Sequence, residues 1–211
     1  MITHVIFDLD GTLIDTARLT KRAMLNTAKL FGVEAPSDEA LRAAMGYANP
    51  EFYFRLFPNE PREKVVRLGC QVEAEEERLM PRMGPQLLFP DCESVLTLLR
   101  RRSVSLYIAS TGSRAHVEAA LRVTGAGRFF DAVFCGEAEK GAMIGRIVKG
   151  DPAEWAMVGD MRKDSDGARE NGILAVGACF GYCRRAEALF DMYVDTPRQL
   201  LDIIGSKRRP V

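Results

Sequence analysis

The sequence lacks the features that would indicate a membrane, a nucleic acid or an oxidising environment. No apolar run approaches the roughly 20 residues that cross a bilayer, and Met1 to Phe7 leads straight into an acidic cluster, unlike a signal peptide. Net charge is also missing, since 29 Lys and Arg balance 29 Asp and Glu. We therefore expect neither nucleic acid nor an anionic membrane as a partner.

Paired cysteines are missing as well. The five cysteines are odd in number and have no paired metal-ligand spacing, which is typical of reduced thiols in a cytoplasmic protein. The remaining composition, 47% hydrophobic and 27% charged over 211 residues, is that of one large globular domain or one domain with a modest insertion. Both a monomer and a homodimer are compatible with this composition.

Short apolar segments alternate with helical patterns over most of the chain. The predicted strands are 4–7, 104–109, 131–135, 155–159 and 174–177, with a short edge strand at 192–194. The predicted helices of this part are 92–101, 113–124, 142–149, 163–171 and 197–204. Continuous apolar runs suit strands that are covered on both faces. The alternation predicts an α/β fold with a doubly wound parallel sheet.

One stretch interrupts this alternation. Residues 16–80 contain no convincing strand and four helical patterns, at 16–31, 37–45, 50–57 and 61–79. The stretch is longer than a simple crossover needs. We therefore expect a helical cap at 16–80, inserted into an α/β core made of residues 1–15 and 81–211.

Polar residues stand where the predicted strands end. Asp8 and Asp10 follow the first strand, Ser110 follows the second, and Asp160 follows the fourth, with Asp164 four residues later. Because parallel strands end at the same edge of a sheet, these side chains are expected to meet there. Lys140, on the connection after the third strand, belongs to the same edge.

These segments resemble the four ordered motifs of the haloacid dehalogenase superfamily. They are FDLDGTLID at 7–15, YIAST at 107–111, Lys140 with Gly141, and VGDMRKDSDGARENGI at 158–173. The predicted cap resembles the small helical cap of that superfamily. The segment beginning VGACFGYCRRAEAL at 176 is similar to the C-terminal half of phosphoglycolate-phosphatase-like members. The resemblance covers essentially the whole chain.

The resemblance implies a phosphohydrolase that forms an aspartyl phosphate on Asp8. A carboxylate fixed at a strand end can accept a phosphoryl group placed in line with it. Asp10, two residues on, is placed to protonate the leaving oxygen and then to activate water. Thr12 is expected to bond locally and support this loop.

A phosphate dianion is repelled by carboxylates, so a cation is expected in the site. The resemblance implies Mg²⁺ held by Asp8, the backbone carbonyl of Asp10, and Asp160. Asp164 is either a further ligand or a residue that orients the others and holds Lys140. At this stage both roles for Asp164 stay open.

The phosphoryl oxygens need positive and hydrogen-bonding partners. Lys140 is favoured as the cation over Lys149, which is predicted to end a helix. Ser110 is expected to donate its hydroxyl, with the N–H groups of Thr111 and Gly112 nearby. Thr111 replaces Ser110 if the strand register is shifted by one residue.

The cap is less informative. Relatives with such a cap recognise their substrate through a loop between the first cap helices, which here would be Gly46-Tyr47-Ala48-Asn49. Tyr47 and Asn49 are therefore the candidate substrate-binding residues of the cap. Basic residues on the first cap helix, Arg18, Lys21 and Arg22, are expected to form its solvated face rather than reach the site.

We thus expect a Mg²⁺-dependent phosphatase acting on a small phosphorylated metabolite. The first alternative is a sugar phosphomutase of the same superfamily. The second alternative is a regulator that binds phosphate, or accepts a phosphoryl group, with little turnover. The second carboxylate, Asp10, argues against a dehalogenase, because relatives that attack carbon lack it.

Overall fold

A computed structural model of the chain describes residues 1–45, 47, 49–186 and 189–204. The chain divides into two compact units, which we describe separately. One, the core unit, is made of Met1–Asp15 and Leu88–Val211. The other, the insert unit, is Thr16–Leu87. Within the described ranges, none of the helices combines the length and the apolar character that crossing a bilayer requires.

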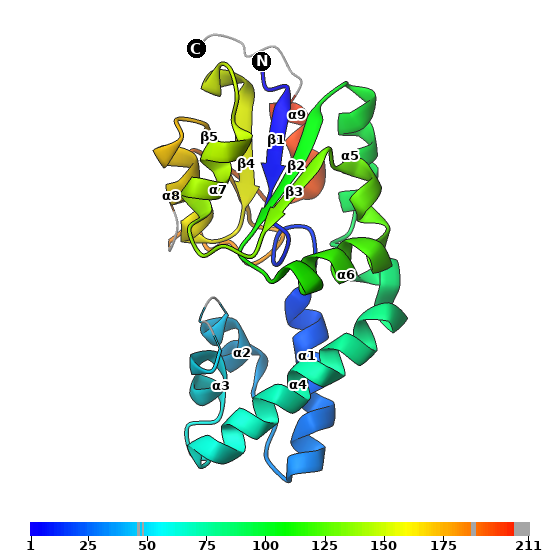
Figure 1. Ribbon diagram of the computed structural model, residues 1–211, viewed down its shortest axis with the longest axis vertical. Helices are drawn as coiled ribbons and strands as arrows, with labels where there is room; N and C mark the ends of the chain where they lie inside the picture. The colour runs from blue at the N-terminus through cyan, green and yellow to red at the C-terminus, as the bar shows by residue number, and fades with distance from the viewer. Residues whose placement is uncertain (46, 48, 187–188, 205–211) are drawn as a thin grey trace. The chain divides into compact units, whose positions relative to one another are not determined.

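The core unit is built on six parallel strands in the order β3-β2-β1-β4-β5-β6 (Figure 1). They are β1 (His4–Phe7), β2 (Ser105–Ser110), β3 (Ala132–Cys135), β4 (Trp155–Gly159), β5 (Leu174–Ala178) and β6 (Met192–Val194). Because β1 pairs with both β2 and β4, the order of strand addition reverses at β1. The predicted doubly wound parallel sheet is confirmed, and its expected ligand crevice lies at the carboxyl ends beside this reversal.

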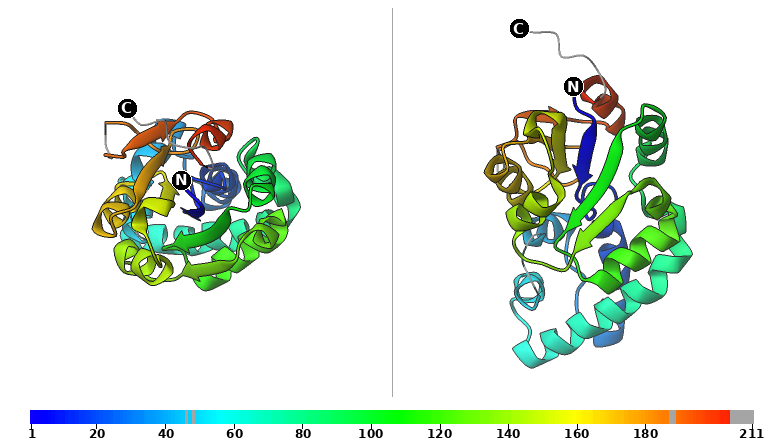
Figure 2. Two further views of the ribbon diagram at one scale, coloured as in Figure 1. Left: turned by 90° about the horizontal axis from the view of Figure 1, so that it is seen from above. Right: turned by 45° about the horizontal axis from the view of Figure 1, so that its top comes forward.

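Helices cover both sides of the sheet (Figures 1 and 2). They are α5 (Cys92–Arg101), α6 (Arg114–Thr124), α7 (Lys140–Ile147), α8 (Arg162–Glu170) and α9 (Leu200–Ile203). Ile144 of α7 and Ala168 of α8 pack in one buried cluster with Ile6, Met157 and Ala175 of the strands. All five residues of β4 are buried, which is why its sequence is apolar throughout.

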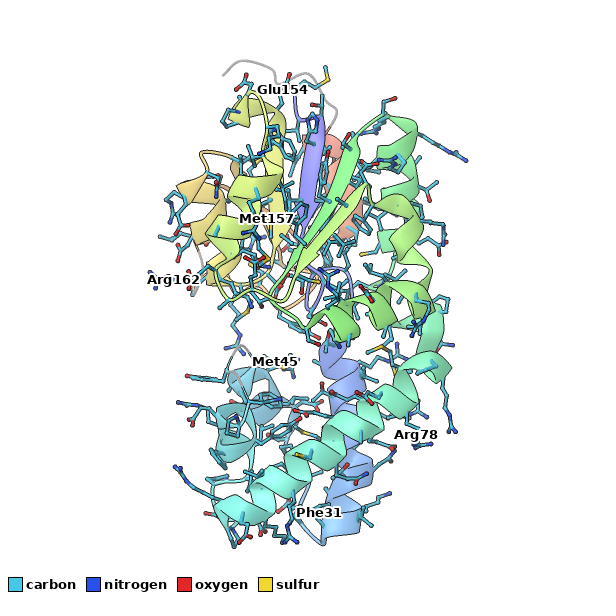
Figure 3. All side chains as sticks on the ribbon, viewed as in Figure 1. Phe31, Met45, Arg78, Glu154, Met157 and Arg162 are labelled. Atoms are coloured by element: carbon cyan, nitrogen blue, oxygen red, sulfur yellow. The ribbon has the colours of Figure 1, made fainter. Side chains whose placement is uncertain are left out.

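The ends of β4 orient the site. Glu154 and Arg162, which flank the strand region in sequence, lie at opposite ends of the sheet in Figure 3, with Met157 between them. Asp160 follows the strand on the Arg162 side. This end of the sheet therefore carries the residues that the sequence placed after the strands.

Two helices of the core unit differ from the prediction by two residues or more. α7 begins at Lys140 and ends at Ile147, two residues earlier than expected at both ends. The first residues of α7, Lys140 and Gly141, are not apolar, so the helical pattern of apolar residues begins only after them. At the C-terminal side, residues 197–199 form a 3₁₀ turn and only Leu200–Ile203 is α-helical.

The insert unit contains α1 (Thr16–Phe31), α2 (Asp38–Ala44), α3 (Glu51–Leu56), α4 (Arg62–Met83) and a 3₁₀ turn at Gly84–Leu87. The two long helices are joined by Asn26, whose Nδ2 donates to Glu75 Oε1 at 2.6 Å. α4 continues four residues past its predicted end at Leu79. Pro81 near the C-terminus of the helix forfeits only one hydrogen bond, and Gly84, at φ 50°, ends it.

The basic residues of α1 make contacts within the insert unit. Lys21 Nζ lies 2.5 Å from Asp38 Oδ1. Arg18 Nη1 donates to the carbonyl of Gln86 at 3.3 Å. Arg22 is exposed. These positions agree with a polar outer face of the helix.

Candidate active site

Asp8 lies at the carboxyl end of β1 and is buried, with 4% of its surface exposed. Lys140 Nζ donates to Asp8 Oδ1 at 2.6 Å and to the carbonyl oxygen of Ala109 at 2.7 Å. The same ammonium lies 2.8 Å from Asp164 Oδ1. One buried lysine thus joins groups from β1, β2 and the segment after β4.

The rival lysine lies elsewhere. The backbone carbonyl of Lys149 accepts the indole N–H of Trp155 at 2.9 Å. Trp155 begins β4, whereas Asp160 follows the end of that strand. Lys149 therefore lies at the opposite end of the sheet, and the structure brings Lys140 to Asp8 instead.

Asp160 stands beside Asp8 because β1 and β4 are paired in parallel, Phe7 against Val158. Asp8, Asp160 and Asp164 each offer a carboxylate oxygen, and these oxygens lie within 4.8 Å of one another. Thr12 Oγ1 donates to Asp160 Oδ1 at 2.8 Å. The expectation that Thr12 bonds locally was wrong, because its hydroxyl crosses from the loop after β1 to the end of β4.

Burial and neighbouring charges shift the pKa values of Asp8, Asp160 and Lys140. Burial raises the pKa of Asp8 to about 6 against the opposing effect of Lys140. Burial also raises the pKa of Asp160 well above its usual range, and the charges of Asp8 and Asp164 add to the effect. For Lys140, burial lowers the pKa, but Asp164 and Asp8 outweigh burial and keep the ammonium charged. The ammonium of Lys140 alone cannot balance the charges of Asp8, Asp160 and Asp164, so repulsion between the carboxylates adds to burial in raising the pKa values of Asp8 and Asp160.

The cluster fits a divalent cation. Asp160 Oδ2 is buried and has no hydrogen-bond partner among the described residues. A Cβ at Gly11 would lie only 2.5 Å from this oxygen, so the glycine lets the loop backbone come close to it. An unpartnered buried carboxylate oxygen is costly, and a hard cation that prefers oxygen ligands removes that cost.

Asp164 has both of its oxygens in contact with protein groups. Oδ1 faces Lys140, and Oδ2 accepts the N–H groups of Asp160 at 3.2 Å and Met161 at 3.0 Å. Asp164 is also an acidic residue in the first turn of α8. Asp164 is thus placed to orient its neighbours and to pair with Lys140, but its Oδ1, like Oδ2 of Asp160, is buried without a hydrogen-bond partner among the described residues and also suits a cation.

Asp10 follows Asp8 by two residues, but its side chain is 30% exposed. Its Oδ1 lies 2.8 Å from Nε2 of His116 in the first turn of α6. Sequence reasoning missed His116. The available signal was its rarity, as one of two histidines in the chain, together with its place just after the second strand.

The loop after β2 presents polar groups beside β1. Ser110 is buried, and its Oγ accepts the N–H of Gly112 at 3.1 Å. Thr111 Oγ1 accepts a hydrogen bond from Lys163 Nζ at 2.6 Å. Lys163 of α8 is a second lysine at this end of the sheet, and it was not among the predicted site residues although it directly precedes Asp164.

A close backbone contact holds the loop after β1. Tyr182 N donates to the carbonyl oxygen of Gly11 at 3.2 Å, and Tyr182 Oη donates to Asp15 Oδ1 at 3.1 Å. A Cβ at Gly181 would lie 1.8 Å from the Gly11 carbonyl oxygen. Glycine at position 181 is therefore needed for the segment after β5 to lie against this loop.

The insert unit has a hollow of its own, of about 170 Å³. Tyr47 and Asn49, the candidate substrate residues of the cap, both line it, together with Thr20, Tyr53 and Glu76. Asn49 Nδ2 donates to Glu73 Oε1 at 2.6 Å, and the Arg55 guanidinium lies over the Tyr47 ring at 3.8 Å. Gly46 and Ala48 of the same predicted loop lie outside the described residues.

Fold and site together define a class of enzyme in which a parallel α/β sheet carries clustered carboxylates and a lysine at its carboxyl edge. The family model described as haloacid dehalogenase-like hydrolase matches residues 5–178. The chain belongs to this family and, within it, to the phosphoglycolate-phosphatase-like subgroup. It is a phosphatase.

Similar proteins agree with this assignment. A phosphoglycolate phosphatase of Synechococcus elongatus is 31% identical over 97% of this chain and 98% of its own length. Pyrophosphatase PpaX of Halalkalibacterium halodurans is 29% identical over 99% of both chains. A haloacid dehalogenase-like hydrolase of Streptococcus pneumoniae shares the fold, with a TM-score of 0.78, 23% identity and coverage of 96% of this chain and 98% of the other.

Proposed function

We propose that the chain is a Mg²⁺-dependent phosphatase that hydrolyses a small phosphorylated metabolite through a phosphoryl group carried on Asp8. The observation that carries this proposal is the contact of Lys140 with Asp8, at 2.6 Å, beside the unpartnered Oδ2 of Asp160. The nucleophile and a buried oxygen that suits a cation thus follow the neighbouring strands β1 and β4, and Lys140 at the start of α7 supplies the counter-charge. This grouping suits transfer of a dianionic phosphoryl group.

In the first proposed step, a carboxylate oxygen of Asp8 bonds to phosphorus and the bond from phosphorus to the leaving oxygen breaks. Lys140 holds one oxygen of Asp8 and fixes the direction in which the carboxylate faces. Asp10 gives a proton to the leaving oxygen, which departs as an alcohol from an ester or as phosphate from pyrophosphate. Ser110 and the N–H of Thr111 donate hydrogen bonds to the phosphoryl oxygens.

In the second step, Asp10, now a carboxylate, accepts a proton from water. The water oxygen bonds to phosphorus, and the bond from phosphorus to Asp8 breaks. Free phosphate leaves and Asp8 is restored. Mg²⁺, when held by Asp8, Asp160 and the Asp10 carbonyl, supplies positive charge that lowers the repulsion between the phosphoryl group and the carboxylates.

The proposed substrates are small phosphate esters or pyrophosphate. The support is the pair of relatives named phosphoglycolate phosphatase and pyrophosphatase PpaX, both of which align along nearly the whole chain. Tyr47 and Asn49 are the proposed residues of the insert unit that contact the remainder of the substrate. Their support is the hollow that they line.

The proposal is tested by measuring phosphate release from phosphoglycolate, pyrophosphate and p-nitrophenyl phosphate with Mg²⁺ or with EDTA. We expect many turnovers with Mg²⁺ and none with EDTA. A single turnover per enzyme would support the phospho-accepting regulator instead. Conversion of a hexose 1-phosphate to its 6-phosphate without free phosphate would support the phosphomutase.

A further inference from the structure

The side chain of His116 lies against the two loops that form the phosphoryl site. Nε2 is 2.8 Å from Oδ1 of Asp10. Its Cδ2 lies so near Gly112 that a Cβ there would come within 3.4 Å of it. The same Cβ would be 3.2 Å from Ser110 Oγ. The imidazole thus occupies the space between the loop after β1 and the loop after β2.

The local structure fixes the direction of this ring. Ser113 precedes α6 and accepts the N–H of His116 on its Oγ at 3.3 Å, so the helix begins at Arg114. His116 is consequently in the first turn, at the end of the helix that faces the strand ends. His116 is 30% exposed, like Asp10, whereas Asp8 is buried.

We propose that His116 is a positioning residue that holds the carboxyl group of Asp10 in place for proton transfer. This inference rests on the proposed function of Asp10 as acid and base. The proposed cycle uses Asp10 in both forms, as a carboxylic acid and as a carboxylate. In the proposed arrangement, the Nε2–H of His116 donates to Oδ1 of Asp10 both when Oδ2 carries the proton and when the group is a carboxylate, so Oδ2 is left for proton transfer. One contact therefore serves both steps.

The side chain of Asp10 is less enclosed than that of Asp8. Asp8 is buried and held by Lys140, whereas the side chain of Asp10 is 30% exposed and contacts His116. A misplaced proton donor slows transfer steeply, because the reaction requires hydrogen-bond geometry at the leaving oxygen. The residue that orients Asp10 should therefore affect kcat more than KM.

The test compares two amides that differ by one methylene. In His116→Gln, the amide group is as many bonds from Cβ as Nε2 is, and an amide can both donate and accept. In His116→Asn, the amide is one bond shorter and does not reach Asp10. His116→Leu removes the polar group altogether and serves as a second disruptive variant. Glu118→Gln, on the same helix, is the control.

We expect Gln to keep kcat within about threefold and Asn and Leu to lower it about tenfold to a hundredfold, with KM changed less than twofold. With p-nitrophenyl phosphate, whose leaving group needs no proton, Asn and Leu should still release one nitrophenolate rapidly. Phosphoenzyme should then accumulate, because the second step still needs Asp10. Glu118→Gln should match the wild type.

Equal kinetics for Gln and Asn, or equal losses in both steps, would overturn the positioning role. Adding the His116→Asn change to Asp10→Asn supplies a check that does not depend on wild-type activity levels. If His116 acts through Asp10, the double variant should turn over no more slowly than Asp10→Asn alone. A wild type that hydrolyses no phosphate compound would instead refute the proposed function itself.

Discussion

The ammonium of Lys140 lies 2.6 Å from a carboxylate oxygen of Asp8, although 132 positions separate the two residues in sequence. The side chains are 1% and 6% exposed, so water screens the pair very little. A buried charge that loses its partner is strongly unfavourable. The stability of the fold and the proposed chemistry therefore depend on the same contact.

Replacing Lys140 with Gln should lower both the rate of phosphate release and the stability of the fold. We expect the rate of phosphate release to fall about 100-fold or more, because a preorganised positive group is lost. The free energy of unfolding should fall by about 3 to 5 kcal/mol, because two buried carboxylates lose their counter-charge. Steady-state kinetics and urea denaturation measure the two effects. Lys149→Gln is the matched control, and similar losses in both variants would contradict the assignment.

The raised pKa of Asp8 predicts a pH dependence of stability without metal. The folded protein holds this proton up to a pKa of about 6, whereas the pKa of a free Asp carboxyl group is 3.8. The folded state therefore binds more protons between these values, and this contribution to stability is lost as pH rises through that window. Burial of Asp160 acts in the same direction.

Urea denaturation in EDTA at pH 4, 5, 6 and 7 tests this expectation. Stability of the wild type should fall over the interval more steeply than that of Asp8→Asn, which has no charge to bury at position 8. Asp8→Asn should also release no phosphate. Parallel curves for the two proteins would show that Asp8 does not titrate as inferred.

Mg²⁺ should stabilise the fold through Asp160. A cation that binds only the folded state adds about 2.7 kcal/mol when its concentration is 100 times Kd. We expect Mg²⁺ to raise the melting temperature of the wild type and to leave that of Asp160→Asn nearly unchanged. Asp166→Asn removes an exposed carboxylate of α8 that pairs with Arg169 and should respond to Mg²⁺ as the wild type does.

The contact between Gly181 and Gly11 predicts a steric effect. In Gly181→Ala, the new methyl group would meet the Gly11 carbonyl oxygen at 1.8 Å, so one of the two segments must move. We expect a loss of activity together with a lower melting temperature. Gly127→Ala is the control, because its Cβ would have no neighbour nearer than 3.6 Å. An active, stable Gly181→Ala enzyme would show that the loop tolerates displacement.

The strands β1, β4 and β5 could be predicted well because they are mostly buried on both faces. Trp155–Gly159 is apolar at every position, and its bounds match the prediction. The alignment of the strand ends followed from the parallel sheet alone, so the meeting of Asp8 with Asp160 could be anticipated. Buried strands can be predicted from the sequence because burial on both faces requires a continuous run of apolar residues.

The remainder of the site depends on partners that are distant in sequence. The hydroxyl of Thr12 donates a hydrogen bond to Asp160, which is 148 positions away, and no local sequence pattern indicates this contact. The beginning of α7 was misplaced because Lys140 is polar yet buried, a combination that only distant carboxylates make favourable. His116 and Lys163 were missed for the same reason, since their side chains meet the site through tertiary contacts.

The wide spacing of these residues also has a consequence for synthesis of the chain. Asp8 is synthesised 132 positions before Lys140, and Asp160 and Gly181 follow later still. Until then β1 has no β4 beside it, and its carboxylates have neither the lysine nor the glycine contact that shapes their loop. A nascent chain that stops before Lys140 should carry the nucleophile and yet release no phosphate, so translation itself delays the onset of catalysis.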